Sequence, residues 1–239
     1  MFTSLGYEAP PQEEVAPREV HGHGGFNPYE DNGGTTLGIC GEDFALIATD
    51  TRQSNGRYNI NSRNMSKAFQ LSNGAVLATS MCFADGKQLV EDLEQRAQLY
   101  FHKHDKQMST SAMAQMLSQV MYSRRFFPYY VFPLLGGVDA RGKGLVYNYD
   151  ALGNIESVSH YAYGSASTLL TPFLDNQLQR QHQRGADPNA RPTREQAIKL
   201  TIDAFTSATE RDIYTGDWLE IFIIDSEGVH MQKRELKHD

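Results

Sequence analysis

The chain has 239 residues, 40% hydrophobic and 21% charged, and its 22 basic and 29 acidic side chains give a formal net charge of −7. A chain of this length can bury a core without disulfides or a structural metal, and two cysteines, Cys40 and Cys82, are too few for a secreted disulfide scaffold. The acidic balance argues against nucleic acid or an anionic membrane as the main partner, no apolar run reaches the roughly 18 residues of a transmembrane helix, and the N-terminus lacks a secretory signal pattern.

Residues 1–34 differ in composition from everything that follows. The segment contains four prolines and five clustered glycines but few aliphatic residues. Such a segment cannot bury enough apolar surface to fold by itself. We therefore interpret it as an arm or a removable leader.

The rest of the chain alternates between groups of short β-like runs and pairs of helical patterns. The first two runs flank residues 41–43, a connection short enough for a hairpin, and apolar residues at three- to four-residue spacing mark four helices. Thr193 and Gln196 form a capping-box pattern at the start of the last helix. In chain order we expect strands at 35–40, 44–49 and 74–80, helices around 89–101 and 113–121, strands at 134–138, 145–149 and 155–163, helices around 169–178 and 198–205, and a hairpin of 219–224 with 229–232.

This grouping of like elements predicts the fold class. Single strands alternating with single helices would indicate a parallel sheet, whereas grouped strands and grouped helices indicate antiparallel sheets with helices on their faces. The sequence therefore predicts an α+β fold. We find no internal repeat and no domain boundary after residue 35.

Two glycine motifs suggest anion binding but have simpler explanations. Residues 33–38 contain a glycine pattern like a phosphate loop, yet they open a strand run and do not follow one. Residues 164–167 stand between a strand and a helix, where backbone N–H groups could bind an anion. A tight turn with a helix N-cap is the more ordinary interpretation.

Two histidine pairs and one aromatic segment are also ambiguous. His21 with His23 and His102 with His104 have metal-ligand spacing, but neither pair has an evident third ligand, so we expect no metal. Residues 124–130 interleave arginine with aromatics, as binders of single-stranded nucleic acid do. As one isolated patch in an acidic protein, the segment is more typical of a packed surface, such as one between subunits.

A more specific signal is a set of short sequence motifs in a fixed order. Residues 33–36 begin the first strand, 48–52 end the second, Lys67 follows, and 211–217 close the last helix. In these motifs the sequence resembles the β subunits of the 20S proteasome. Five longer motifs resemble the members at the beta-6 position of the ring, and they span residues 26–29, 41–45, 124–130, 172–177 and 207–211.

This resemblance implies a fold, a function and partners. It implies the four-layer α/β/β/α sandwich of the N-terminal nucleophile hydrolases, with two antiparallel sheets between helix pairs. It also implies a non-catalytic, structural subunit of the β ring, without cofactor, in the cytoplasm and nucleus. The implied partners are the other β subunits of a heteroheptameric ring, the opposite β ring and the adjoining α ring.

The resemblance further implies which residues form the site. Active members of the family use an N-terminal threonine hydroxyl as nucleophile, sixteen residues before the first aspartate of the set. Here that aspartate is Asp50, and counting back sixteen residues reaches Gly34, which has no hydroxyl. Lys67, Asp212 and Thr215 match the supporting positions, with threonine where the family usually has serine. A catalytic scaffold without its nucleophile is therefore expected, as a buried and satisfied charge network.

The remaining implications concern processing and a neighbouring subunit. Residues 1–25 correspond to a leader that is removed near Gly24, Gly25 and Phe26, residues 26–34 to an N-terminal extension, and 35–239 to the folded domain. A neighbouring active subunit would make the cut. Asp139 matches a family position that helps to define an outer substrate pocket of the adjacent subunit.

Two alternatives remain open at this level. In the first, cleavage before Thr35 frees that residue as a true nucleophile, although a register shift of one residue would turn its hydroxyl to the opposite face of the strand. In the second, the chain is a free-standing binding domain. That alternative predicts a monomer, and aromatic clusters such as residues 126–130 argue against it.

Overall fold

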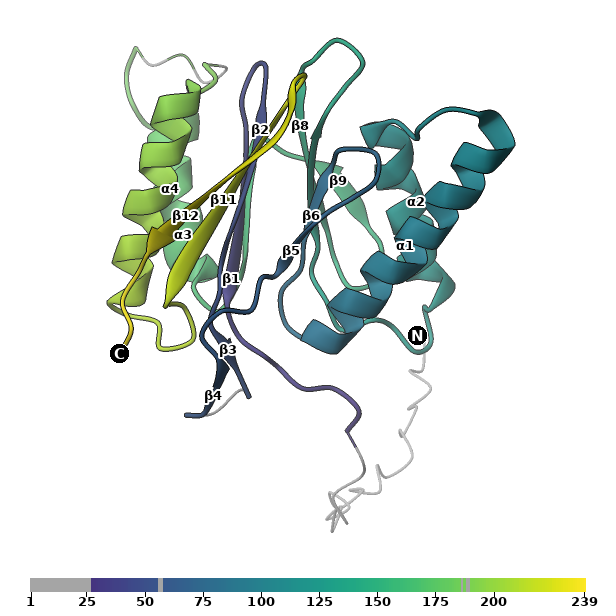
Figure 1. Cartoon of the computed structure of the whole chain (residues 1–239). Helices are drawn as coiled ribbons and strands as arrows, with labels where there is room; N and C mark the ends of the chain where they lie inside the picture. The colour runs from purple at the N-terminus through teal and green to yellow at the C-terminus, as the bar shows by residue number, and fades with distance from the viewer. Residues whose placement is uncertain (1–26, 56–57, 186, 188–189) are drawn as a thin grey trace, which may run out of the picture.

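Two five-stranded antiparallel sheets pack face to face between two pairs of helices (Figure 1). The structure is a computed structural model that describes residues 27–55, 58–185, 187 and 190–239. The first sheet has, in spatial order, β10 (His160–Gly164), β1 (Thr35–Cys40), β2 (Ala45–Asp50), β11 (Trp218–Asp225) and β12 (Gly228–Glu235). The second has β5 (Ala68–Gln70), β6 (Val76–Ala78), β7 (Leu134–Val138), β8 (Gly144–Tyr149) and β9 (Ile155–Ser157).

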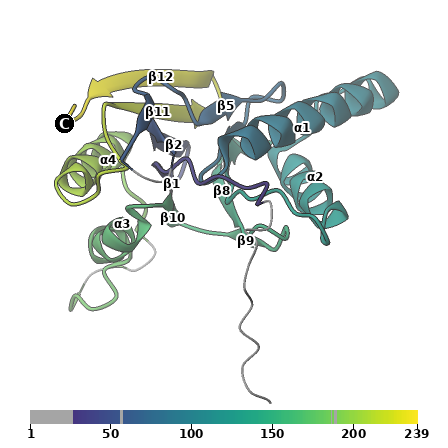
Figure 2. The same cartoon turned by 90° about the horizontal axis from the view of Figure 1, so that it is seen from below.

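The helices cover the outer faces of the two sheets. Helices α1 (Phe83–His104) and α2 (Thr110–Ser123) lie on the second sheet, and α3 (Ser167–Leu174) and α4 (Arg194–Thr209) lie on the first, as Figure 2 shows from below. The strand pair β3 (Gln53–Ser54) and β4 (Ile60–Ser62) forms a small separate sheet, and a π-helical turn, η1 (Asp175–Gln179), continues α3. This arrangement confirms the four-layer α/β/β/α sandwich and the α+β class.

Alternating side chains of the first sheet serve two different cores. Leu37 and Leu46 pack toward α3 and α4, while Ile47 packs between the sheets. A third core lies between the second sheet and α1 with α2, around Leu89 and Leu117. Since successive strand residues point to opposite faces, a shift of one residue in β1 moves a side chain from one core to the other. The position of a residue in β1 therefore determines which face of the sheet its side chain occupies.

Most predicted elements are confirmed, including several boundaries. Strand β1 spans 35–40 as predicted, Ser109 caps α2, and Thr193 and Gln196 form the predicted capping box at α4. Cys40 and Cys82 are free and buried, as ordinary core residues are. None of the described helices is long and apolar enough to cross a membrane.

The prediction of one strand over 155–163 is wrong. The segment forms β9 and β10, which belong to different sheets. The Val158 N–H donates to the Val146 carbonyl in the second sheet, whereas the next carbonyl, that of Ser159, accepts from Cys40 in the first. The chain changes sheets between these two residues. Both halves are short and β-like, so the sequence pattern resembles one continuous strand and conceals the crossing.

Candidate functional site

Gly34 lies directly before β1, in a backbone conformation that favours glycine. Its φ is +81°, and a Cβ atom placed there would come within 2.3 Å of Lys67 Cε, 2.7 Å of Lys67 Nζ and 2.9 Å of Asp50 Oδ1. Real side chains essentially never approach so closely. The end of Lys67 therefore occupies the space into which any side chain at position 34 would extend.

Lys67 and Asp50 form a buried ion pair beneath Gly34. Their side chains are 3% and 0% exposed, and Lys67 Nζ lies 3.1 Å from Asp50 Oδ1. The ammonium also donates to the backbone carbonyls of Asp50 at 2.9 Å and Arg52 at 2.7 Å. An ammonium has three N–H donors, so these three contacts use all of them.

The Asp50 carboxylate also organises the backbone around the site. Oδ1 accepts the Thr35 N–H at 2.8 Å, and Oδ2 accepts the Gly216 N–H at 3.2 Å. Burial raises the pKa of the Asp50 carboxyl, and the Lys67 ammonium and these backbone donors oppose the rise. Asp50 thus ties the start of β1 to the loop before β11.

The Thr35 side chain belongs to a separate hydroxyl chain. Its Oγ1 accepts the Ala166 N–H at 3.1 Å and lies 2.7 Å from Thr215 Oγ1. Since the Thr215 hydroxyl donates to Asp212 Oδ2 at 2.5 Å, the Thr35 proton points to Thr215. Thr35 is fully buried. The structure therefore directs this hydroxyl away from Lys67 and from solvent.

Ser165 connects the hydroxyl chain to Gly34. Its hydroxyl donates to Asp212 Oδ2 at 2.5 Å, and its N–H donates to the Gly34 carbonyl at 3.0 Å. The predicted tight turn is present, with Gly164 at φ +96°. The helix cap, however, is Ala166, which makes no side-chain cap hydrogen bond. The Ser165 hydroxyl is engaged at the site instead of at the helix terminus.

A second charge cluster holds the C-terminal tail beside the site. The buried carboxylate of Asp217 accepts from Arg52 Nε at 2.8 Å and from Arg63 Nη1 at 2.6 Å, and it lies 3.2 Å from His238 Nδ1. Arg52 Nη2 also donates to the Lys237 carbonyl at 3.3 Å. Burial opposes ionisation of Asp217, but the hydrogen bonds from Arg52, Arg63 and His238 prevail and hold its pKa below the usual value.

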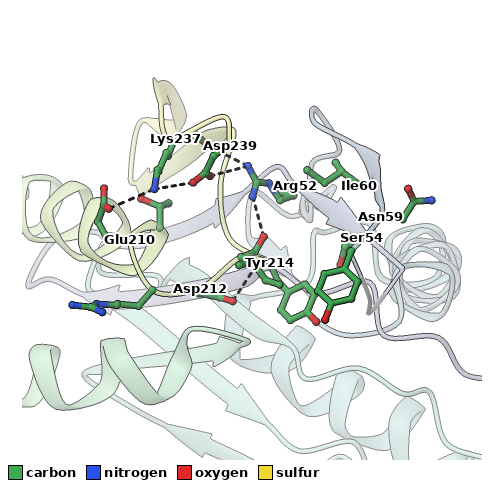
Figure 3. A pocket seen from close by; sticks show the side chains of 13 residues that line it. Arg52, Ser54, Asn59, Ile60, Glu210, Asp212, Tyr214, Lys237 and Asp239 are labelled. Atoms are coloured by element: carbon green, nitrogen blue, oxygen red, sulfur yellow. Dashed lines mark hydrogen bonds and ion pairs between the residues drawn. The ribbon is translucent and has the colours of Figure 1, made fainter.

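A surface cavity of about 330 Å³ lies over this cluster (Figure 3). Arg52, Tyr214, Lys237 and Asp239 line it, and Lys237 pairs with Asp239 at 2.7 Å. Both signs of charge meet in the cavity. Lys237 pairs with both Asp239 and Glu210, and Arg52 also lies near Asp239. Mutual pairing of this kind is typical of a structural network.

Asp139 lies away from the site, in the turn between β7 and β8. Its Oδ1 accepts the Arg141 N–H at 2.7 Å and the Lys143 N–H at 2.9 Å. These backbone hydrogen bonds hold the pKa of Asp139 below its usual value. The carboxylate therefore shapes its own turn, at the surface of the molecule.

The other sequence motifs do not contribute to this site. His21, His23 and the expected cleavage position near Gly24, Gly25 and Phe26 lie outside the described residues. No group of three or more His, Cys, Asp or Glu side chains within the described ranges could hold a metal ion, so His102 and His104 gain no third ligand there. Gly33 and Gly34 precede β1 and Gly38 lies within it, and each of the three packs against side chains of other segments.

Three residues at the site have roles that the sequence does not indicate. The sequence places Ser165 only in a turn, and it gives Arg52 and Asp217 no role of their own. Arg52 immediately follows the Asp50-Thr51 motif, and Asp217 ends the 211–217 motif. Both residues therefore lie in or beside motifs that the sequence shows. Their pairing could not be predicted, because Arg52 and Asp217 are 165 positions apart in the chain.

Comparisons with known proteins agree on one family. The family model described as "Proteasome subunit" matches residues 30–224. The chain is 46% identical over 239 residues to proteasome subunit beta type-1 of Drosophila melanogaster, covering 100% of both chains. It is 48% identical over 220 residues to proteasome subunit beta type-1 of Arabidopsis thaliana, covering 91% of this chain and 98% of that one. It is 43% identical over 222 residues to proteasome subunit beta type-6 of Saccharomyces cerevisiae, covering 90% and 92%.

Proposed function

The chain belongs to the proteasome subunit family, and from that premise we propose that it is a non-catalytic subunit of the 20S core particle. Its role is structural: it holds one place in the β ring and helps to close the proteolytic chamber. We propose the beta-6 position of a heteroheptameric ring, in contact with the opposite β ring and the adjoining α ring. We also propose that the protein is located in the cytoplasm and nucleus.

The observation that carries the proposal is the environment of Gly34. Attack on a peptide carbonyl needs a nucleophile with a nearby group that favours its reactive form. Position 34 supplies no hydroxyl, and Lys67 fills the space where a side chain would stand. The lysine is engaged by Asp50 and Arg52. The Lys67 ammonium thus stabilises the Asp50 carboxylate and has no nucleophile at position 34 to activate.

Thr35 is a poor substitute for the missing nucleophile. Its hydroxyl is buried and held between Ala166 and Thr215, on the face that packs toward α3. Catalytic groups lose much of their effect when displaced by about 1 Å, and one residue along a strand is about 3.3 Å. The geometry thus favours a structural role for Thr35.

Replacement of Thr35 in the assembled particle tests the proposal. We expect Thr35→Val particles to keep every peptidase activity of the wild-type particle, because no peptide bond is cleaved by this chain. Thr35→Ser, which keeps the hydroxyl, is the matched control for assembly. Loss of one activity in Thr35→Val but not in Thr35→Ser would establish Thr35 as a nucleophile and overturn the proposal.

We also propose that Asp139 helps to shape a substrate pocket of the adjacent subunit. Its surface position and its ordered turn support this role. We further propose that residues 1–25 are removed by a neighbouring active subunit, which leaves 26–34 as an N-terminal extension of the domain at 35–239.

A further inference from the structure

An exposed aromatic segment begins at the end of α2 and includes none of the residues described at the site around Gly34. We call residues 122–130 the aromatic turn. Phe126 is 97% exposed, Tyr122 63% and Phe127 61%. Large aromatic side chains gathered in this way mark interaction sites far more often than single exposed apolar residues do. Aromatic and arginine side chains also dominate the binding energy of protein interfaces.

The backbone of the aromatic turn is held in place before any partner arrives. Tyr130 N–H donates to Asp85 Oδ2 at 2.8 Å, and the Tyr29 hydroxyl donates to the Pro128 carbonyl at 2.8 Å. The Tyr29 ring also packs on Phe127, with centroids 5.9 Å apart. An ordered loop loses little conformational entropy on binding. The turn is therefore preorganised as a docking element.

The aromatic turn carries two positive charges that pair with no carboxylate among the described residues. Arg124 stacks over the Tyr129 ring at 4.3 Å and Arg125 lies 5.8 Å from the Phe126 ring centroid. Within the described part of the chain, neither guanidinium takes part in an ion pair, although the protein as a whole is acidic. Arginines held on aromatic faces keep their fork of N–H donors available for carboxylates.

We propose that the aromatic turn docks against a neighbouring proteasome subunit, with Phe126 in an apolar pocket and acidic side chains opposite Arg124 and Arg125. This inference rests on the proposed function, which supplies the neighbour. A second copy of this chain fits less well, because a symmetric contact would bring like charges together. Nucleic acid fits less well too, since two arginines in an acidic protein offer few phosphate contacts.

Thiol accessibility at position 126 tests the proposal. Phe126→Cys places a thiol at an almost fully exposed site, while Cys40 and Cys82, at 4% and 6% exposure, give little background. We expect rapid reaction with a maleimide in the free chain and at least about 10-fold slower reaction in the assembled particle, because an interface anchor is withdrawn from solvent. Denatured particles should react at the rate of the free chain.

The outcomes separate this inference from the proposed function. If the wild-type chain does not enter the particle at all, the proposed function fails. If it enters and the introduced thiol stays as reactive as in the free chain, only the docking proposal fails. If the free full-length chain already protects the introduced thiol, and removal of residues 1–26 exposes it, the chain's own segment is the occupant and the proposal is wrong.

A charge-reversal variant tests the chemistry of the partner. Arg124→Glu/Arg125→Glu should compete poorly with the wild-type chain for incorporation, by about 10-fold, because like charges would then face each other across the contact. Arg124→Lys/Arg125→Lys keeps the charge and is the matched control. Equal incorporation of the reversed and wild-type chains would contradict the expected acidic partner.

Discussion

Lys67 Nζ lies 3.1 Å from Asp50 Oδ1, and the same lysine fills the space into which a side chain at position 34 would extend. The pair is buried and fully hydrogen-bonded, so it needs no substrate to satisfy its charges. A buried pair of this kind is costly to break when one partner is removed, because the other charge is left without compensation. A buried ion pair with these contacts can therefore stabilise the fold without taking part in catalysis.

The Asp50–Lys67 pair predicts that replacing Lys67 with an uncharged residue strongly lowers the stability of the fold. Lys67→Met keeps much of the length of the side chain but leaves the Asp50 carboxylate buried and unpaired, and we expect a loss of about 3–5 kcal/mol in the free energy of unfolding. Denaturant unfolding of the isolated chain measures it. The double variant Asp50→Asn/Lys67→Met should lose less than the sum of the single losses, and strict additivity would argue against a direct pair.

Gly34 predicts a difference between two glycines with the same backbone conformation. Gly34 and Gly74 have φ values of +81° and +83°, but a Cβ at Gly74 would meet nothing within 4 Å. Alanine at either position costs about 1–2 kcal/mol for the left-handed conformation. Gly34→Ala should cost more, because Lys67 must move. Equal losses of unfolding free energy would contradict the placement of Lys67.

Two variants at Asp139 distinguish the effect of its negative charge from the effect of its hydrogen bonds to the turn. Asp139→Asn retains a side-chain oxygen that can accept the Arg141 and Lys143 N–H groups, whereas Asp139→Ala loses both charge and turn. If the charge shapes a neighbour's pocket, both variants should alter the peptide preference of the particle without reducing its assembly. A change in Asp139→Ala alone would instead assign the effect to the turn.

Asp217 predicts a pH-dependent contribution to stability. Because its pKa is held below the usual value, its ionised form stabilises the fold above the unfolded-state pKa of about 3.9, and that contribution is lost as pH falls through the lower folded-state pKa. Asp217→Asn should therefore be less stable than wild type near pH 7, by about 2 kcal/mol for its charged hydrogen bonds. The difference should shrink below about pH 4.

Thermal or denaturant unfolding from about pH 3 to about pH 7 measures this difference. Glu235→Gln is a useful control, because Glu235 contacts the same His238 but is exposed. A gap between Asp217→Asn and wild type that stays constant down to the lowest pH would contradict an ionised Asp217 in the folded chain.

Local patterns in the sequence were sufficient for much of the fold. The run at 35–40 is β-like and has a short hairpin connection to the next run, so its bounds were predictable. The capping box at Thr193 was equally local. The split of 155–163 was not predictable, because it depends on which distant strands, at Cys40 and Val146, offer hydrogen-bond partners.

The candidate site residues were named by the family resemblance, and their packing was not predictable. The resemblance, through its spacing of sixteen residues before the first aspartate, identified Gly34 as the position without a hydroxyl. The entry of Lys67 into the space at Gly34 and the reach of Ser165 to Asp212 depend on tertiary contacts. No local pattern encodes such contacts, so only the folded chain reveals them.

The intact mass of this chain, isolated from assembled particles with and without a threonine-directed covalent inhibitor, tests the central claim most directly. The account predicts a mature N-terminus upstream of Gly34, near Phe26, and no mass increase with inhibitor. A mature N-terminus at Thr35 together with an inhibitor adduct on that residue would contradict it.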